Sequence, residues 1–85
     1  MQTIMIEYQI LQGLVNDEEY TRQVMPFVKE DYFTQPDQKL VFKIIGQYFE
    51  KYNALPAPEA LLIEINQVGG FDEKTIKSAV DIVES

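Results

Sequence analysis

Apolar residues recur every three or four positions along most of this chain, which is the spacing of one face of an α-helix. The clearest case is residues 36–52, where Pro36 suits the first position of a helix. The apolar positions of this segment are Leu40, Val41, Ile44, Ile45, Tyr48, Phe49 and Tyr52. They cover about half of the helical circumference, with Phe42 at the edge of the arc. The opposite face is polar, so we expect this helix to be central to the fold.

Start and stop signals predict two helices before it. Thr3 can cap the first helix and Asp17 the second, which Pro26 ends. The apolar side of the first helix carries Ile4, Tyr8, Ile10, Leu11, Leu14 and Val15. Glu7 lies within the same arc, and we expect a partly exposed carboxylate or one that accepts a helix-terminal N–H. Four apolar residues of the following connection are expected to add to the interior: Phe27, Val28, Tyr32 and Phe33.

Prolines and glycines set the limits of two further helices. Pro58 begins the fourth helix, and Gly69–Gly70 stops it, with Gly69 expected in the left-handed conformation past its end. Asp72 caps the fifth helix, and Phe71 precedes it as a hydrophobic staple. One face of that helix is apolar through Ile76, Ala79, Val80 and Val83. The predicted fold is all-α, a compact bundle of about five helices in one domain, residues 1–85.

Charge narrows the classes of partner. Fourteen acidic residues oppose seven basic ones, which gives a net charge of −7, and Arg22 is the only arginine. Proteins that grip nucleic acid neutralise its phosphates with lysine and arginine, so we expect no direct nucleic-acid contact. The same charge disfavours an anionic membrane surface, and no apolar stretch approaches the roughly 20 residues of a membrane span. The N-terminus does not resemble a signal peptide. We therefore expect a cytoplasmic protein whose partner is a basic protein.

The residues offer no reactive group. The chain has no cysteine and no histidine, which removes the usual nucleophile and zinc arrangements. Lys74 and Ser78 stand four residues apart, and we interpret them as exposed helix residues. Gly69–Gly70 lacks the lysine of a phosphate-binding loop. Acidic clusters at 17–19, 30–31 and 72–73 fit helix starts and turns. We predict no catalytic site, no cofactor and no metal.

Aromatic side chains are the remaining signal. Five tyrosines and five phenylalanines are many for a core of this size, and both types are enriched at protein interfaces. We therefore predict a protein-binding surface. Its candidate residues are Phe42, Phe49, Tyr52, Ile76, Val80 and Val83. The last three lie on the fifth helix, whose apolar pattern is still running at Ser85, so we expect polypeptide beyond Ser85 to cover them.

Three packing motifs resemble those of one known family. The first is Glu7-x-x-Ile10-Leu11-x-Gly13-Leu14, followed by Asp17. The second is Asp31-Tyr32-Phe33 with the later pair Val41-Phe42, and the third is Leu55-Pro56-Ala57-Pro58-Glu59-Ala60-Leu61. Together they resemble the N-terminal domain of the DnaB-type replicative DNA helicases over about residues 6–65. Gln12 stands where that family usually has glycine, and the turn after the third helix lacks its usual Pro-Ile-Asp. These departures are similar to those of helicases from tailed bacteriophages.

The resemblance implies a function that the residues alone do not. In this family such domains assemble around the helicase ring above the motor and help to receive the primase or the helicase loader. The chain would then be a non-catalytic collar domain, the first part of a longer hexameric helicase. Its implied partners are further copies in the ring, a primase and a loader, and a phage protein would act in the host cytoplasm.

Two other interpretations stay open. The helicase-binding domain at the end of a primase has a similar fold, although Met1 at the start of this chain favours the helicase. A small phage regulator that binds a host protein is the other alternative. An enzyme is the least supported, because no reactive constellation exists.

Overall fold

The computed structural model describes residues 2–84 and their side chains from Ile6 onward. Five α-helices account for most of the chain, and two short 3₁₀ turns, Met25–Phe27 and Glu30–Tyr32, link the second helix to the third. The helices are α1 (Gln2–Asn16), α2 (Glu18–Val24), α3 (Pro36–Tyr52), α4 (Pro58–Gln67) and α5 (Glu73–Glu84). No strand occurs within residues 2–84. The predicted all-α bundle of five helices is confirmed.

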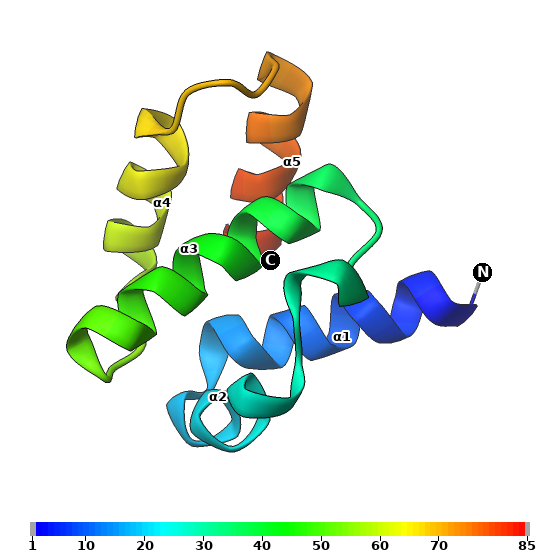
Figure 1. The fold of residues 1–85 in the computed structure, drawn as a ribbon. Helices are drawn as coiled ribbons and strands as arrows, with labels where there is room; N and C mark the ends of the chain where they lie inside the picture. The colour runs from blue at the N-terminus through cyan, green and yellow to red at the C-terminus, as the bar shows by residue number, and fades with distance from the viewer. Residues whose placement is uncertain (1, 85) are drawn as a thin grey trace.

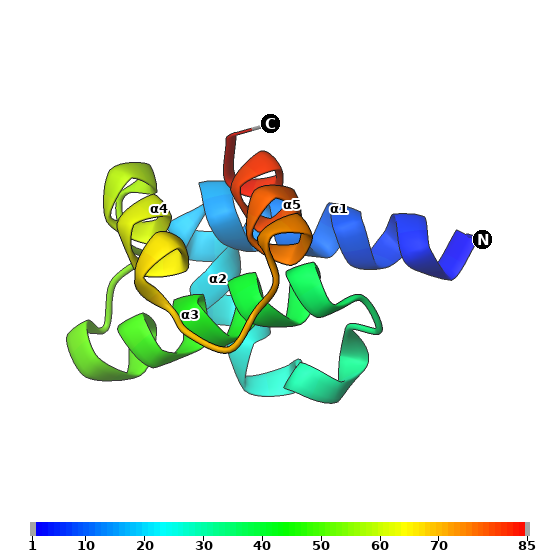
Figure 2. The same ribbon diagram turned by 90° about the horizontal axis from the view of Figure 1, so that it is seen from above.

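Helix α3 is central, as its wide apolar arc predicted. In Figure 1 it runs across the middle of the molecule, with α4 and α5 on one side and α1 and α2 on the other. It packs against α1, α4 and α5. The view from above in Figure 2 shows that the first turns of α1 extend past the other helices. The fold therefore has a compact body and one projecting helix end.

Most predicted helix limits are confirmed by their hydrogen bonds. Asp17 caps α2 by accepting the N–H of Tyr20 at 3.1 Å, and Asp72 accepts the N–H of Thr75 at 2.9 Å. Two details were wrong. Thr3 does not cap α1, because the helix already includes Gln2. The left-handed glycine after α4 is Gly70, with φ of 88°, because α4 ends at Gln67 and Val68 leaves it in an extended conformation.

The core lies where the helix faces meet. Its buried apolar residues are Leu11, Leu14, Val15, Phe33, Leu40, Val41, Phe42, Ile44, Ile45, Leu61, Ile65, Ala79, Ile82 and Val83. Three expectations for the interior were wrong, and a fourth falls on a residue whose side chain is not described. Phe27 is 85% exposed, while Tyr8 and Tyr32 stay partly exposed. The side chain of Ile4 lies outside the described residues. Phe33 takes the core space beside Phe42, with ring centroids 5.1 Å apart, and the turn that carries Phe27 remains outside.

The apolar face of α1 contains a buried carboxylate. Glu7 is only 2% exposed, so the expectation of partial exposure was wrong. Its Oε1 accepts the backbone N–H of Thr34 at 3.2 Å and the hydroxyl of Thr34 at 3.3 Å. A buried polar group needs such partners, and these two come from the turn just before α3. Glu7 thus holds the start of α3 against α1.

Two neighbouring residues of α1 set its packing on α2 and α5. A Cβ atom added to Gly13 would lie 2.7 Å from Cε2 of Tyr20, so only glycine allows this close approach. Gln12 stands where the resembling family usually has glycine. Its Nε2 donates to the backbone carbonyl of Ile82 at 2.9 Å. The long side chain therefore joins α1 directly to the last turn of α5.

Candidate functional site

A groove lies between the C-terminal half of α3 and helix α4. Its volume is about 230 Å³. Five of its lining residues come from α3 and one from α4: Ile44, Gln47, Tyr48, Lys51, Tyr52 and Glu64. Ile44 is almost fully buried, whereas Tyr52 is 55% exposed. We call this surface the α3–α4 groove.

Aromatic rings and two opposite charges line the α3–α4 groove. The ring centroids of Tyr48 and Tyr52 are 4.5 Å apart with the planes tilted by 46°. Nζ of Lys51 lies 5.3 Å from the centroid of the Tyr52 ring, within range of a cation–π interaction. Glu64 supplies a carboxylate from α4. The groove thus combines an apolar base, an aromatic wall, an ammonium group and a carboxylate.

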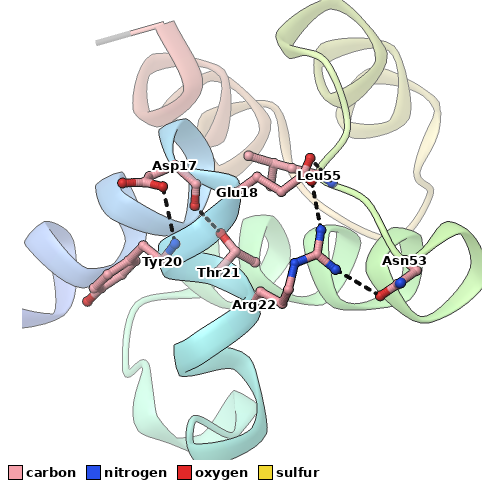
Figure 3. A network of polar contacts seen from close by, with 7 residues as sticks. All are labelled: Asp17, Glu18, Tyr20, Thr21, Arg22, Asn53 and Leu55. Atoms are coloured by element: carbon pink, nitrogen blue, oxygen red, sulfur yellow. Dashed lines mark hydrogen bonds and ion pairs between the residues drawn. The ribbon is translucent and has the colours of Figure 1, made fainter.

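An adjoining face of the same half of α3 is closed by Arg22 of α2. Its Nη2 donates to Oε2 of Glu18 at 2.8 Å and its Nη1 to Oδ1 of Asn53 at 3.3 Å (Figure 3). Its guanidinium carbon lies 5.3 Å from the centroid of the Phe49 ring. Oε1 of Glu18 accepts the N–H of Leu55 at 3.2 Å. These contacts fix the end of α3 and the connection to α4. We call them the Arg22 clasp.

The same network anchors α2 to α1. The hydroxyl of Thr21 is buried and lies 2.8 Å from the carbonyl oxygen of Leu14 and 2.9 Å from that of Asp17. Figure 3 shows Thr21 and the Asp17 cap next to the Arg22 clasp. Because buried hydroxyls need hydrogen-bond partners, Thr21 specifies how α2 sits on α1. Sequence reasoning missed this residue, since threonine gives no apolar signal.

The projecting end of α1 is a second surface of interest. Residues 2–16 contain a single charged residue, Glu7, and its side chain is buried. Ile6 is 50% exposed on this helix. Both ribbon views show the first turns of α1 standing clear of the body (Figures 1 and 2). A helix surface without charges is typical of one that another polypeptide covers.

The structure places the six predicted interface residues in different environments. Phe42 and Val83 are core residues, so the expectation that they line a surface is corrected. Phe49 lies under Arg22, and Ile76 and Val80 pack partly against the core. Tyr52 alone of the six is largely exposed, and it lines the α3–α4 groove. The half-exposed Ile6 and Ile63 and the exposed Phe27 were missed, because apolar periodicity does not tell a core face from a covered surface.

Nothing in the described part of the chain adds reactive chemistry. Among its side chains no group of three or more aspartates and glutamates could hold a metal ion. The search for a helix long and apolar enough to cross a membrane found none in residues 2–84. Hydrogen bonds from the hydroxyl and the backbone N–H of Thr75 lower the pKa of the exposed Asp72 carboxyl, as expected for a helix cap.

Comparison with known proteins identifies one family. The model of the DnaB-like helicase N terminal domain matches residues 1–85. No curated protein and no solved structure gives a significant match. The residues of the three sequence motifs have clear structural roles here: Leu11, Leu14, Phe33, Val41 and Phe42 form the core, and Gly13 lets α1 approach Tyr20.

Proposed function

Because this chain belongs to the family of DnaB-like helicase N-terminal domains, we propose that it is an assembly and docking module of a hexameric replicative DNA helicase. In this proposal it performs no catalysis, and the ATP-dependent motor belongs to another part of the parent protein. It packs against further copies in the collar of the ring and receives a primase or a helicase loader. The family match supports the helicase over a primase domain or a free-standing phage regulator.

The uncharged projecting end of α1 is the observation that carries the assembly role. One quarter of the whole chain is charged, yet the exposed part of this helix carries no charge. Leaving Ile6 half exposed in water is unfavourable, since apolar surface contributes roughly 25 cal/mol per Å² when it is buried. Contact with a second copy would cover this surface without desolvating a charge. We therefore assign self-association to α1.

Sedimentation velocity over a range of chain concentrations tests the assembly role. We expect the average mass to rise with concentration and Ile6→Lys to shift association to higher concentration, because a charge would enter an apolar contact. Ile63→Lys is the matched control, since Ile63 is 56% exposed on α4 and adds the same charge elsewhere. A chain that stays monomeric at every concentration, or equal effects of both substitutions, would contradict the assignment.

Docking is tested by mixing the chain with the primase and the helicase loader encoded by the same genome. We expect one of them to form a complex that survives gel filtration. Because the net charge of −7 steers basic surfaces towards the domain, complex formation should slow as salt rises. If the chain alone binds duplex or single-stranded DNA and forms no complex with the primase or the loader, the docking role is contradicted.

A further inference from the structure

The α3–α4 groove and the Arg22 clasp contain the same kinds of group on adjoining faces of one helix. At 100° per residue, Phe49 lies about 100° around α3 from Tyr48 and about 60° from Tyr52, so the two aromatic surfaces adjoin each other around the helix. The clasp joins an aromatic ring of α3, a carboxylate of a neighbouring helix and an arginine. The groove has the aromatic wall of Tyr48 and Tyr52 and the carboxylate of Glu64. It has no arginine, since Arg22 is the only one in the chain.

No cation of the described side chains lies within 4.0 Å of the Glu64 carboxylate. Among side chains from Ile6 to Glu84, the one ion pair within 4.0 Å joins Arg22 and Glu18. Lys51 lines the same groove as Glu64 but lies against the Tyr52 ring. The carboxylate is therefore available to an incoming cation, and the domain's net charge of −7 attracts one.

We propose that the α3–α4 groove binds an arginine side chain on a basic segment of a protein partner. The guanidinium is planar and weakly hydrated, so it can stack on a tyrosine ring while it donates two hydrogen bonds to the carboxylate of Glu64. Its aliphatic stem lies on Ile44. This inference rests on the docking function proposed above and names the chemistry of the partner. A lysine has neither the planar fork nor the same tendency to stack, so it binds less well.

Short peptides of known composition test the occupant. The probes are acetyl-Ala-Xaa-Ala-amide peptides in which Xaa is arginine, lysine, citrulline or glutamate, titrated into the ¹⁵N-labelled chain and followed by NMR. We expect the arginine peptide to shift the amide signals of residues 44–52 and of Glu64. The citrulline peptide, which has the same shape without the charge, should bind about tenfold more weakly. Equal binding of the arginine and citrulline peptides would overturn the proposal.

Two substitutions in the groove have opposite expected effects. Glu64→Gln should weaken arginine-peptide binding about threefold to fivefold, because it removes the paired carboxylate. Lys51→Gln should strengthen binding about twofold, because it removes a like charge from the groove. Glu59→Gln is the matched control, since Glu59 lies exposed on α4 outside the groove. If the groove instead binds an acidic segment, Glu64→Gln should strengthen binding and Lys51→Gln should weaken it. If it binds an apolar segment, neither substitution should change the affinity. Either result refutes the proposal.

A third pair of variants tests the aromatic wall. Tyr52→Phe keeps the ring and should leave binding within about twofold, whereas Tyr52→Leu should weaken it about threefold to tenfold. Circular dichroism of each variant checks that the helices are intact. Equal binding of the arginine peptide by Tyr52→Phe and Tyr52→Leu would show that the guanidinium does not stack on the Tyr52 ring.

The same samples separate this inference from the proposed function. Glu64→Gln should leave the concentration dependence of the sedimentation coefficient unchanged, because the assembly surface is on α1. If the arginine peptide fails to bind while the chain still associates and still captures primase or loader, only the groove inference is wrong. If no self-association and no capture occur, the proposed function fails whatever the peptides do.

Discussion

The two faces of the C-terminal half of α3 differ in what the domain itself supplies. On the face towards α2, Arg22 lies over Phe49 and binds both Glu18 and Asn53, so ring, carboxylate and helix end are satisfied internally. On the face towards α4, Tyr48 and Tyr52 stand beside a carboxylate that has no arginine. The first arrangement holds the fold together, and the second leaves binding capacity at the surface. If the groove binds arginine as we propose, similar residues serve stability or recognition according to whether the matching cation belongs to the same chain.

We expect the largest loss of stability from a change in the packing of α1 on α2. The face of α3 that Arg22 closes depends on this packing. Gly13→Val should lower the free energy of unfolding by about 2–3 kcal/mol, because the added atoms overlap the Tyr20 ring. Gly69→Ala is the control, since its added Cβ meets nothing within 4 Å. Urea unfolding followed by circular dichroism measures both. Equal stability of the two variants would mean that α1 and α2 do not need this close approach.

The buried carboxylate that holds the start of α3 comes next. Glu7→Leu should lower the free energy of unfolding by about 1–2 kcal/mol, because the N–H and the hydroxyl of Thr34 lose their acceptor in a partly buried setting. Glu7→Gln keeps an acceptor oxygen and should cost less. Hydrogen exchange of the Thr34 amide should accelerate most in Glu7→Leu. A more stable Glu7→Leu protein would show instead that burying the carboxylate costs more than its hydrogen bonds contribute.

Arginine and lysine on the two faces give a direct comparison. Arg22→Ala should lower the free energy of unfolding by about 1 kcal/mol, because it removes a solvent-screened ion pair, a hydrogen bond and a stacking contact together. Lys51→Ala should change the free energy of unfolding by less than about 0.5 kcal/mol, since Lys51 is at the surface and its ammonium lies over the exposed Tyr52 ring. The melting temperatures of the two variants, measured by thermal unfolding, test this difference in stability. Similar losses would remove the distinction between a closed and an open face.

The smallest effect concerns the exposed cap of α5. The lowered pKa of Asp72 means that its ionised form stabilises the folded state. That contribution is present above the carboxyl's ordinary pKa of about 4 and is lost as the pH falls through the lower folded value. In Asp72→Asn, the urea midpoint should depend slightly less on pH between about 5 and 2. An unchanged pH profile would show that the Thr75 contacts are too weak to matter.

The helices could be predicted from the sequence because their signals are local. Pro36, Pro58, Asp17 and Asp72 act within one turn of the chain, and each marks the start of a helix in the structure. Phe27 was misplaced: it is exposed on the short turn Met25–Phe27, whereas Phe33, six residues later, is buried in the core. Helical spacing gives the same pattern in both cases.

The α3–α4 groove could not be predicted in the same way. Tyr48 and Tyr52 lie on the apolar arc of α3, and the sequence assigned both to the buried side. Their exposure depends on how α4 crosses α3, which is a property of tertiary packing. Only Tyr52 was named in advance as an interface residue. The role of Glu64 was not foreseen, because an exposed glutamate is ordinary in sequence and distinctive only beside two tyrosines.

The hydrogen bond from Gln12 to Ile82 joins the first helix to the last across 70 positions of sequence. It adds a direct tie between α1 and α5 beside the more extensive packing of both helices on α3. Because this bond bridges almost the whole length of the chain, it forms only when α1 and α5 have both taken their places, and it therefore reports completion of the fold rather than formation of either helix.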